Sequence, residues 1–293
     1  MESKVYNIVL FCFLSFALVS CGVSRRAVPA EYAPAKTDYT GRGRLKEVIC
    51  RSSQPGLTER RMMVYLPENY DDTTKSFPVL YLLHGARGTE LSWIEKGHII
   101  QNVDRLVAEG KAKPMIVVMP NTSQYKDDKD YAKSRQKHLA ESFFEINGTV
   151  EKVFVKDVVG TVDSLYRTVR KREGRAIAGL SIGALQSIFI SATHPEMFDY
   201  VGLFSPMTRP ATCHGKDADF YDSLKKKLAV QFQDPPQLYW VMTGVWDIFY
   251  DLMQHFKFYM NRRHYPYEFY MSPGGHTWKN WEEYCNMFME RIF

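Results

Sequence analysis

A G-x-S-x-G pentapeptide at residues 179–183 is the part of this sequence with the clearest chemical content. It follows the apolar residues 176–178, which are typical of a buried strand. A strand that turns sharply into a helix at such a motif exposes the serine hydroxyl at its tip, and glycines flank the serine because the turn leaves no room for larger side chains. We therefore predict that Ser181 is a nucleophile, rather than a residue that only caps the helix after a glycine-rich turn.

An acidic residue and a histidine follow two later apolar runs. Asp247 comes after the run at 238–242, and His276 comes after the run at 267–271. A serine hydroxyl is a weak nucleophile, so it needs a histidine to accept its proton and a carboxylate to orient and stabilise that histidine. The order Ser, Asp, His along the chain is that of α/β-hydrolases and differs from the orders in chymotrypsin and subtilisin. Ser181, Asp247 and His276 are therefore the predicted catalytic triad.

Other residues compete for these roles. Asp251 is the main alternative to Asp247, but we expect it in the following helix, whereas a triad acid lies in the loop after a strand. His84 precedes a glycine and is expected to shape the loop after its strand. Four other histidines are weaker candidates: His194 is expected at a helix end, and three that have no position directly after a strand are expected to be packed or exposed, namely His214, His255 and His264.

Backbone amides near Ser181 are predicted to stabilise the oxyanion that forms during acyl transfer. The amide after the nucleophile, here that of Ile182, is one such donor. The apolar run at 78–83 leads into a glycine-containing turn, in which the amide of Ala86 is the predicted second donor. Arg87 is a candidate for binding or orienting an acyl group, although an exposed arginine needs no such role.

Four stretches carry a family resemblance, in this order along the chain: residues 80–85, 108–121, 176–181 and 273–278. They resemble the esterase D family of α/β-hydrolases, which includes feruloyl esterases, S-formylglutathione hydrolases and the mycolyltransferases of the antigen 85 group. The resemblance covers roughly residues 45–293 and is closest to the feruloyl esterase-like branch. Two positions depart from that branch: Ala184 stands where a second glycine is usual, and Trp246 stands where a smaller or polar residue is usual.

Apolar runs alternate with segments of helical spacing along most of the chain. This alternation predicts an α/β fold of the α/β-hydrolase type, with a mostly parallel central sheet and helices on both faces. Two early runs, at 46–50 and 61–66, are expected to be leading strands that pair antiparallel at one edge. The later strands are expected at 79–83, 115–119, 176–180, 201–204, 238–242 and 267–271, and helices at 93–109, 153–170, 182–193 and 249–263.

The N-terminal residues are typical of a targeting segment. Lys4 precedes a largely apolar run from Val5 to Val19, which is too short for a membrane-spanning helix with polar flanks. Residues 18–21 resemble a bacterial lipobox, which implies that Cys21 is acylated and becomes the mature N-terminus. An ordinary signal peptide with an incidental cysteine is the alternative.

We predict three parts of the chain. A lipoprotein signal peptide occupies residues 1–20, a flexible tether rich in Ala, Pro, Arg and Gly occupies 21–44, and one esterase domain occupies 45–293. The predicted location is a bacterial cell envelope, where a lipid on Cys21 anchors the protein to a membrane.

The net charge of +5 is small for 293 residues. The basic runs at 167–172 and 225–227 are therefore expected to be solvated helix faces rather than nucleic-acid contacts. No C-x-x-C pair and no Cys/His spacing typical of metal ligands occurs in the sequence. We predict no metal, no cofactor and at most one disulfide among Cys50, Cys213 and Cys285.

These observations predict a serine carboxylic ester hydrolase that removes feruloyl, acetyl or other short acyl groups from a plant polysaccharide or oligosaccharide. The alternatives are an acyltransferase with the same triad and a non-catalytic sugar-binding lipoprotein on the same scaffold. Residues 121–146 and 206–236 are candidates for the rim of the site. Aromatic side chains suit a sugar or phenolic ring, and the candidates for substrate contact are Trp93, Trp246, Trp278 and Tyr125.

Overall fold

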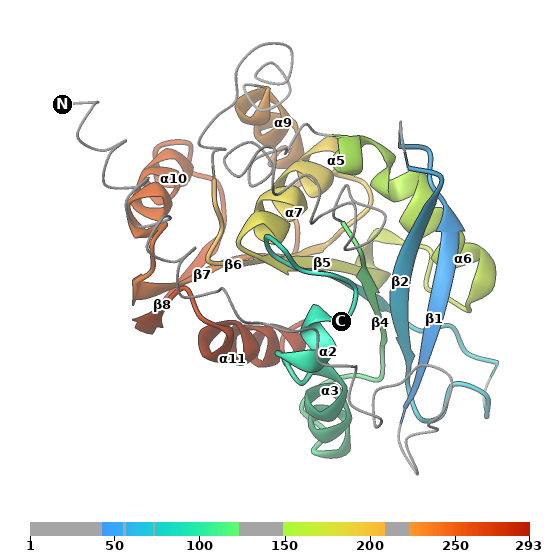
Figure 1. Ribbon diagram of the computed structural model, residues 1–293. Helices are drawn as coiled ribbons and strands as arrows, with labels where there is room; N and C mark the ends of the chain where they lie inside the picture. Colours follow the sequence, from blue (N-terminus) through green and yellow to red (C-terminus); the bar gives the residue numbers. More distant parts are fainter. Residues whose placement is uncertain (1–42, 55–56, 73, 123–148, 209–222) are drawn as a thin grey trace, which may run out of the picture.

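The computed structural model describes residues 43–54, 57–72, 74–122, 149–208 and 223–293. Within them, an eight-stranded sheet has the order β1-β2-β4-β3-β5-β6-β7-β8 (Figure 1). β2 pairs antiparallel with both β1 and β4, and the other neighbours are parallel, so the predicted leading strands at one edge are confirmed. The strands are β1 Arg44–Arg51, β2 Glu59–Leu66, β3 Val79–Leu83, β4 Ile116–Pro120, β5 Arg175–Leu180, β6 Tyr200–Phe204, β7 Leu238–Trp246 and β8 Glu268–Gly275.

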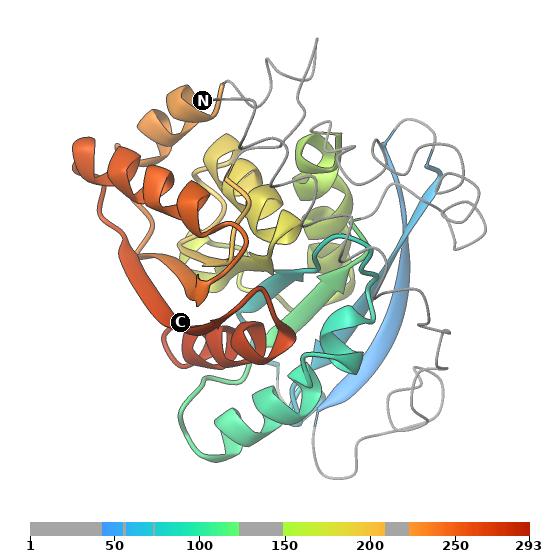
Figure 2. The ribbon, with the colours of Figure 1, turned by 60° about the vertical axis from the view of Figure 1, so that its left-hand side comes forward.

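Helices cover both faces of the sheet, which confirms the predicted α/β-hydrolase fold class (Figures 1 and 2). On one face lie α2 Ser92–Glu95, α3 Ile99–Ala108 and α11 Trp278–Met289. On the other face lie α5 Thr149–Phe154, α6 Gly160–Leu165, α7 Ile182–Thr193, α9 Leu224–Gln231 and α10 Tyr250–Arg262, with a π-helical turn at Val155–Val159 between α5 and α6.

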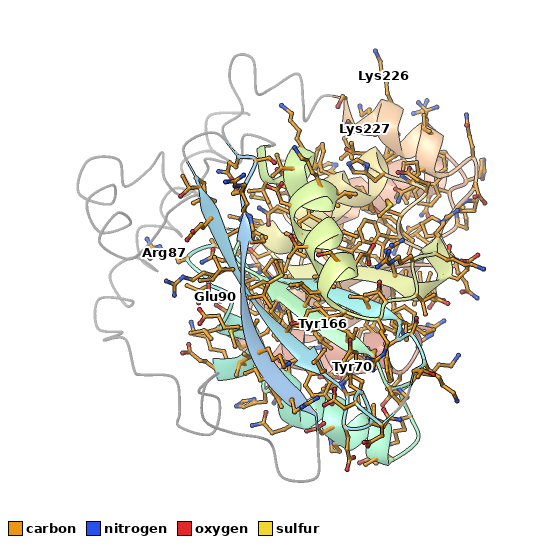
Figure 3. All side chains as sticks on the ribbon, turned by 90° about the vertical axis from the view of Figure 1, so that its right-hand side faces the viewer. Tyr70, Arg87, Glu90, Tyr166, Lys226 and Lys227 are labelled. Carbon is orange, nitrogen blue, oxygen red and sulfur yellow. The ribbon has the colours of Figure 1, made fainter. Side chains whose placement is uncertain are left out.

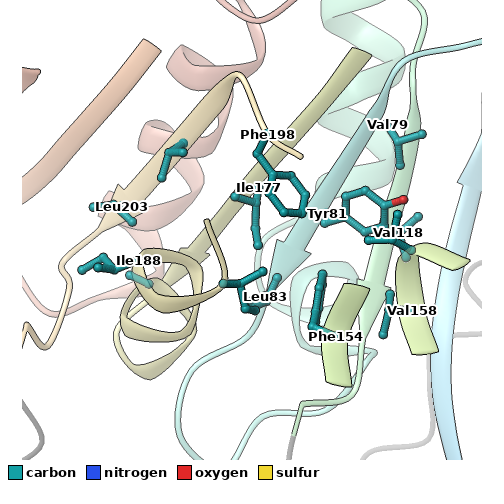
Figure 4. Packing of buried hydrophobic residues seen from close by; sticks show 14 of the residues in the cluster. Val79, Tyr81, Leu83, Val118, Phe154, Val158, Ile177, Ile188, Phe198 and Leu203 are labelled. Carbon is teal, nitrogen blue, oxygen red and sulfur yellow. The ribbon is translucent and has the colours of Figure 1, made fainter. Parts of the chain in front are cut away.

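The central strands are buried on both faces, which explains why their sequences are apolar without alternation. On β3, Leu80 and Leu82 belong to the core on the α3 and α11 side, whereas Tyr81 belongs to the core on the α7 side. Tyr81 packs edge-on against Phe154 and Phe198, with ring centroids 5.9 and 6.0 Å away (Figure 4). The strands at the centre of the sheet are thus fixed from both sides.

The segment 93–109 was predicted to be one helix, and that prediction is wrong because the structure divides it into α2 and α3. The break comes at Gly97 and His98, and His98 has a φ of 47°. A Cβ at Gly97 would lie 2.6 Å from the ring of Trp93 and 3.1 Å from that of Trp278. The chain therefore leaves the helix where it must pass close to two aromatic rings.

The helix predicted at 153–170 begins earlier, with α5, and ends at Leu165. Beyond it the chain is extended, because Thr168 forms a parallel bridge with Phe77. The Phe77 N–H donates to the Arg167 carbonyl over 2.8 Å. A contact with a distant segment thus replaces the last helical turn that the local pattern predicted.

The two basic runs differ in their surroundings. The run at 167–172 is not a helix face, so that prediction is wrong: the Arg167 guanidinium lies 4.1 Å from the ring centroid of Tyr70, which also meets Tyr166 edge-on (Figure 3). The run at 225–227 does lie on a helix, α9, as predicted.

Several predicted features lie outside the described residues. They include the signal peptide at 1–20, nearly all of the tether at 21–44, and Cys213. Cys50 and Cys285 are buried free thiols. Within the described ranges, no helix is long and apolar enough to cross a bilayer. α11 was not among the helices predicted from the sequence, and α9 was indicated only by the basic run at 225–227.

Candidate active site

Ser181 stands at the turn between β5 and α7, with φ 55° and ψ −116°. This conformation is strained for a residue with a side chain, and the Ser181 N–H is held by a 2.9 Å hydrogen bond to the Phe204 carbonyl. A Cβ at Gly179 would lie 2.5 Å from the backbone of Gly183, and a Cβ at Gly183 would lie 2.3 Å from the His84 carbonyl oxygen. The sharp strand-to-helix turn predicted from the motif is therefore present, and it needs both glycines.

His276 connects Ser181 to Asp247. The His276 Nε2 lies 3.0 Å from the Ser181 Oγ, and Nδ1 lies 3.0 and 3.1 Å from the two carboxylate oxygens of Asp247. Because an ionised carboxylate only accepts hydrogen bonds, the ring proton belongs on Nδ1. Nε2 is then the acceptor for the Ser181 hydroxyl, so the arrangement can take a proton from Ser181 and return it.

The Asp247 carboxylate is fully enclosed at the end of β7. Its Oδ1 also accepts a 2.9 Å hydrogen bond from the Phe249 N–H, which helps to satisfy a buried charge. The rings of Phe249 and Trp281 meet the His276 imidazole edge-on, with centroids 5.0 and 4.8 Å away. Packing and hydrogen bonding together fix the direction in which Nε2 points.

The competing candidates lie away from this arrangement. Asp251 is exposed in the first turn of α10, where the sequence placed it, and it is Asp247 that contacts His276. His84 is buried in the loop after β3. Of the other histidine candidates, His194 lies at the end of α7, His255 and His264 are exposed on or after α10, and His214 lies outside the described residues.

The two predicted oxyanion donors flank the nucleophile. Ile182 is the first residue of α7, where backbone N–H groups have no acceptor within the helix. A Cβ at Gly85 would lie 3.4 Å from the Ser181 Cβ, so the loop after β3 packs directly against the nucleophile and presents Ala86 at the surface. Arg87 is exposed in the same turn with a φ of 57° (Figure 3).

His84 is enclosed beneath that turn. Its Nδ1 lies 2.8 Å from the Gly85 carbonyl oxygen, and its Nε2 lies 3.0 Å from the Thr122 N–H nitrogen. Burial lowers the pKa of His84 to about 4, so the imidazole is neutral at neutral pH. A Cβ at Gly88 would lie 2.6 Å from the His84 Nδ1, so the turn needs glycine there for the ring to keep its place.

The predicted aromatic substrate contacts fall into different environments. Trp93 is 1% exposed, and its indole N–H donates a 3.0 Å hydrogen bond to the Leu83 carbonyl, so the prediction that it contacts substrate is wrong. Trp278 is half-buried and packs edge-on against Trp93. Trp246 is 81% exposed and directly precedes the acid of the site, which leaves its ring open to a ligand. Tyr125 lies outside the described residues.

The two rings that hold His276 were not among the residues predicted from the sequence. Trp281 lies in the first turn of α11 and donates its indole N–H to the Ser205 Oγ over 3.0 Å. Helical spacing of apolar residues at 278–289 was the available signal for this helix. Phe249 follows the acid by two positions, and nothing in its local sequence marks it as a contact of the histidine.

The sheet order, the helices on both faces and the Ser-His-Asp geometry define an α/β-hydrolase. Within that class the chain belongs to the esterase family, because the family model described as "Putative esterase" matches residues 53–286.

Individual known proteins are similar to the chain. An endo-1,4-beta-xylanase/feruloyl esterase of Xylanibacter ruminicola is 36% identical over 169 residues, which is 56% of this chain but only 22% of that protein's length. A solved ferulic acid esterase has a TM-score of 0.69 and 27% identity, covering 87% of this chain and 100% of its own. The S-formylglutathione hydrolase of Staphylococcus aureus shares the fold, with a TM-score of 0.61, 20% identity, and coverage of 85% of this chain and 98% of its own.

Acidification is expected to weaken the fold through His84. A histidine in an unfolded chain has a pKa of about 6.5, whereas the pKa of folded His84 is about 4. Between these values the unfolded state binds a proton that the folded state excludes, so the free energy of unfolding falls as the pH decreases. The loss from this group reaches about 3 kcal/mol near the lower pKa.

Urea denaturation of the wild type and of His84→Asn across this pH range measures the effect. The stability of the wild type should fall more steeply with acidification than that of the variant, which lacks the titrating group. Equal slopes in the two proteins would contradict the assignment of a buried neutral imidazole.

Proposed function

We propose that the protein hydrolyses carboxylic esters through an acyl-enzyme on Ser181. The observation that supports this most directly is the hydrogen-bonded chain from Ser181 through His276 to Asp247, in a member of the esterase family. His276 Nε2 takes the hydroxyl proton as the Ser181 Oγ bonds to the ester carbonyl carbon. The same proton then passes to the alcohol oxygen as its bond to the carbonyl carbon breaks.

Water completes the reaction. It attacks the acyl carbon and gives a proton to His276, which returns it to the Ser181 Oγ as the acid leaves. In both steps the N–H groups of Ile182 and Ala86 stabilise the negative carbonyl oxygen, and the Asp247 carboxylate stabilises the transient imidazolium. Apart from the ester and water, every group in these steps belongs to this chain.

The substrate that we propose is a feruloyl, acetyl or other short acyl ester on a plant polysaccharide or oligosaccharide. The likeness to a xylanase/feruloyl esterase and to a ferulic acid esterase supports this choice. The exposed ring of Trp246, next to the acid of the site, supplies an aromatic surface on which a sugar or phenolic ring can pack.

We also propose that the protein is a lipoprotein of the bacterial cell envelope, anchored to a membrane by acylation of Cys21. The support comes from the apolar run before Cys21 and from the lipobox-like residues 18–21. Residues 21–44 would then be the tether that separates the lipid from the esterase domain.

Replacing Ser181 with Ala should remove nearly all turnover while leaving the fold intact. The residual rate should reflect only the oxyanion donors and substrate binding, about 10³–10⁴ over the reaction in water. Hydrolysis of p-nitrophenyl acetate and stoichiometric labelling by a fluorophosphonate measure this. More than a few per cent of wild-type activity in the variant would place the nucleophile elsewhere.

A matched pair of acid variants tests the third member of the triad. Asp247→Asn should lower kcat by up to about 10⁴-fold, because the amide no longer fixes the tautomer of His276. Asp251→Asn should leave kcat within about twofold, since an exposed helix residue away from the site seldom matters. If Asp251→Asn were the more damaging change, the assignment of Asp247 would be wrong.

A substrate comparison tests the acyl and alcohol preference. The protein should hydrolyse methyl ferulate or acetylated xylan with a higher kcat/KM than S-formylglutathione, because an aromatic surface next to the site favours ring-bearing substrates. A clear preference for the glutathione thioester would refute the polysaccharide proposal. Activity on simple acetate and butyrate esters alone would identify a general carboxylesterase.

Replacing Cys21 with Ser should release the protein from the membrane or leave it unprocessed. The thiol is the proposed site of acylation, and serine cannot form the thioether. Detergent partitioning of the two proteins expressed in a bacterial host measures the change. If both partition equally into the detergent phase, the protein has no lipid on Cys21.

A further inference from the structure

His84 lies between two peptide groups and is bonded to both. A carbonyl oxygen only accepts, so the Nδ1 that lies 2.8 Å from the Gly85 oxygen carries the ring proton and donates it. An amide N–H only donates, so the Nε2 accepts the 3.0 Å hydrogen bond from Thr122. The imidazole therefore has one fixed tautomer, with its donor aimed at the loop after β3 and its acceptor aimed at the end of β4.

A buried arginine bonds to the far side of the Thr122 peptide. Arg60, on β2, is 3% exposed, and its Nη1 donates to the carbonyl of Asn121. Its Nη2 donates to the Gln54 Oε1 over 2.7 Å. The carbonyl of Asn121 and the N–H of Thr122 belong to the same peptide group. Arg60 and His84 thus bind opposite sides of one planar unit.

The Gly85 carbonyl is likewise one side of a peptide group whose other side is the Ala86 N–H. In a trans peptide the C=O and N–H bonds point in opposite directions. Because His84 is buried and holds the Gly85 carbonyl, the Ala86 N–H must point away from the ring. The Gly88 N–H also donates to the Gly85 oxygen, over 3.1 Å, and so holds the same peptide group.

We propose that Arg60 and His84 are positioning residues for the oxyanion donor Ala86. The hydrogen bonds run in one direction: from Arg60 to the Asn121–Thr122 peptide, then to His84, and then to the Gly85–Ala86 peptide. Hydrogen bonds in such a chain polarise one another, and a cation at its donor end strengthens the last donor. The Ala86 amide is thus aimed and polarised before substrate binds, which is the form of electrostatic stabilisation that lowers a reaction barrier.

This inference rests on the proposed function, because it needs an oxyanion at Ala86. It predicts effects on kcat with little change in KM, since the oxyanion develops after the ground-state complex. Arg60→Met should lower kcat about 10-fold and His84→Asn about 10²-fold, compared with 10²–10³-fold for the loss of a whole oxyanion donor. Arg60→Lys keeps the cation and a donor and should restore most of the activity.

Arg175 supplies a matched control. It is also a buried arginine, 5% exposed, but it pairs with Asp163 over 2.7 Å at the start of β5, the end of that strand remote from Ser181. Arg175→Met should destabilise the protein and leave the kcat of the folded protein unchanged. A comparison of Arg175→Met with Arg60→Met therefore distinguishes an effect on protein stability from an effect on the orientation of the Ala86 N–H.

The experiment measures kcat and KM for p-nitrophenyl acetate, together with the affinity for a trifluoromethyl ketone, whose adduct with a serine carries the same oxyanion. In Arg60→Met and His84→Asn, ketone affinity should fall in parallel with kcat/KM, while Arg175→Met keeps the wild-type affinity.

If His84→Asn does not fold, the comparison of Arg60→Met with Arg60→Lys tests the proposal. Arg60 and His84 variants that match Arg175→Met in kcat and in ketone affinity would overturn the proposal while leaving the esterase function intact. A folded wild type that neither hydrolyses the ester nor reacts with a fluorophosphonate would overturn both.

Discussion

The close approach of the β5–α7 turn to the loop after β3 is the constraint on which the site depends. A side chain at Gly183 would collide with the carbonyl of His84, and one at Gly85 would collide with a leucine of β5. Because neither position has a Cβ, the backbone after β5 can pack directly against the backbone after β3. The Ser181 hydroxyl and the loop that carries Ala86 are therefore neighbours. The positive φ of Ser181 is maintained because packing on both sides of the turn leaves no alternative path.

Burial makes the polar contacts at this site both strong and expensive to lose. The Asp247 carboxylate has no contact with solvent, and it is bonded by His276 and by the Phe249 amide. Inside a protein an ion pair is stronger than in water, so a protonated imidazole is stabilised where the reaction creates it. The rings of Phe249 and Trp281 that exclude water also restrict the imidazole, so one set of contacts serves both the electrostatics and the orientation.

Local features of the structure were predictable from the sequence. Strands β3 to β6 begin and end within one residue of the predicted runs, because doubly covered parallel strands are apolar without interruption. The same strand ends indicated Ser181, Asp247 and His276, since loops at the carboxyl edge converge. What the sequence could not predict depends on contacts between distant segments. The helix break at Gly97 reflects two rings that approach it, and the extended chain at Thr168 reflects its pairing with Phe77.

The role of Arg60 also depends on contacts with distant segments, so the sequence did not indicate it. Burial of its charge carries an energetic penalty, which calls for an explanation. Arg175 is paired with a carboxylate, but the hydrogen bonds of Arg60 go to two neutral oxygens. Burial lowers the pKa of Arg60, and the carboxylates of Asp157 and Glu151 raise it only in part. Burying a charge carries a desolvation penalty, and neutral acceptors offset it less than a carboxylate does. Stability alone therefore does not explain Arg60. The hydrogen bond from Arg60 to the Asn121–Thr122 peptide, which also bonds to His84, explains its presence. This peptide follows β4, at the carboxyl ends of the parallel strands, where the nucleophile also lies.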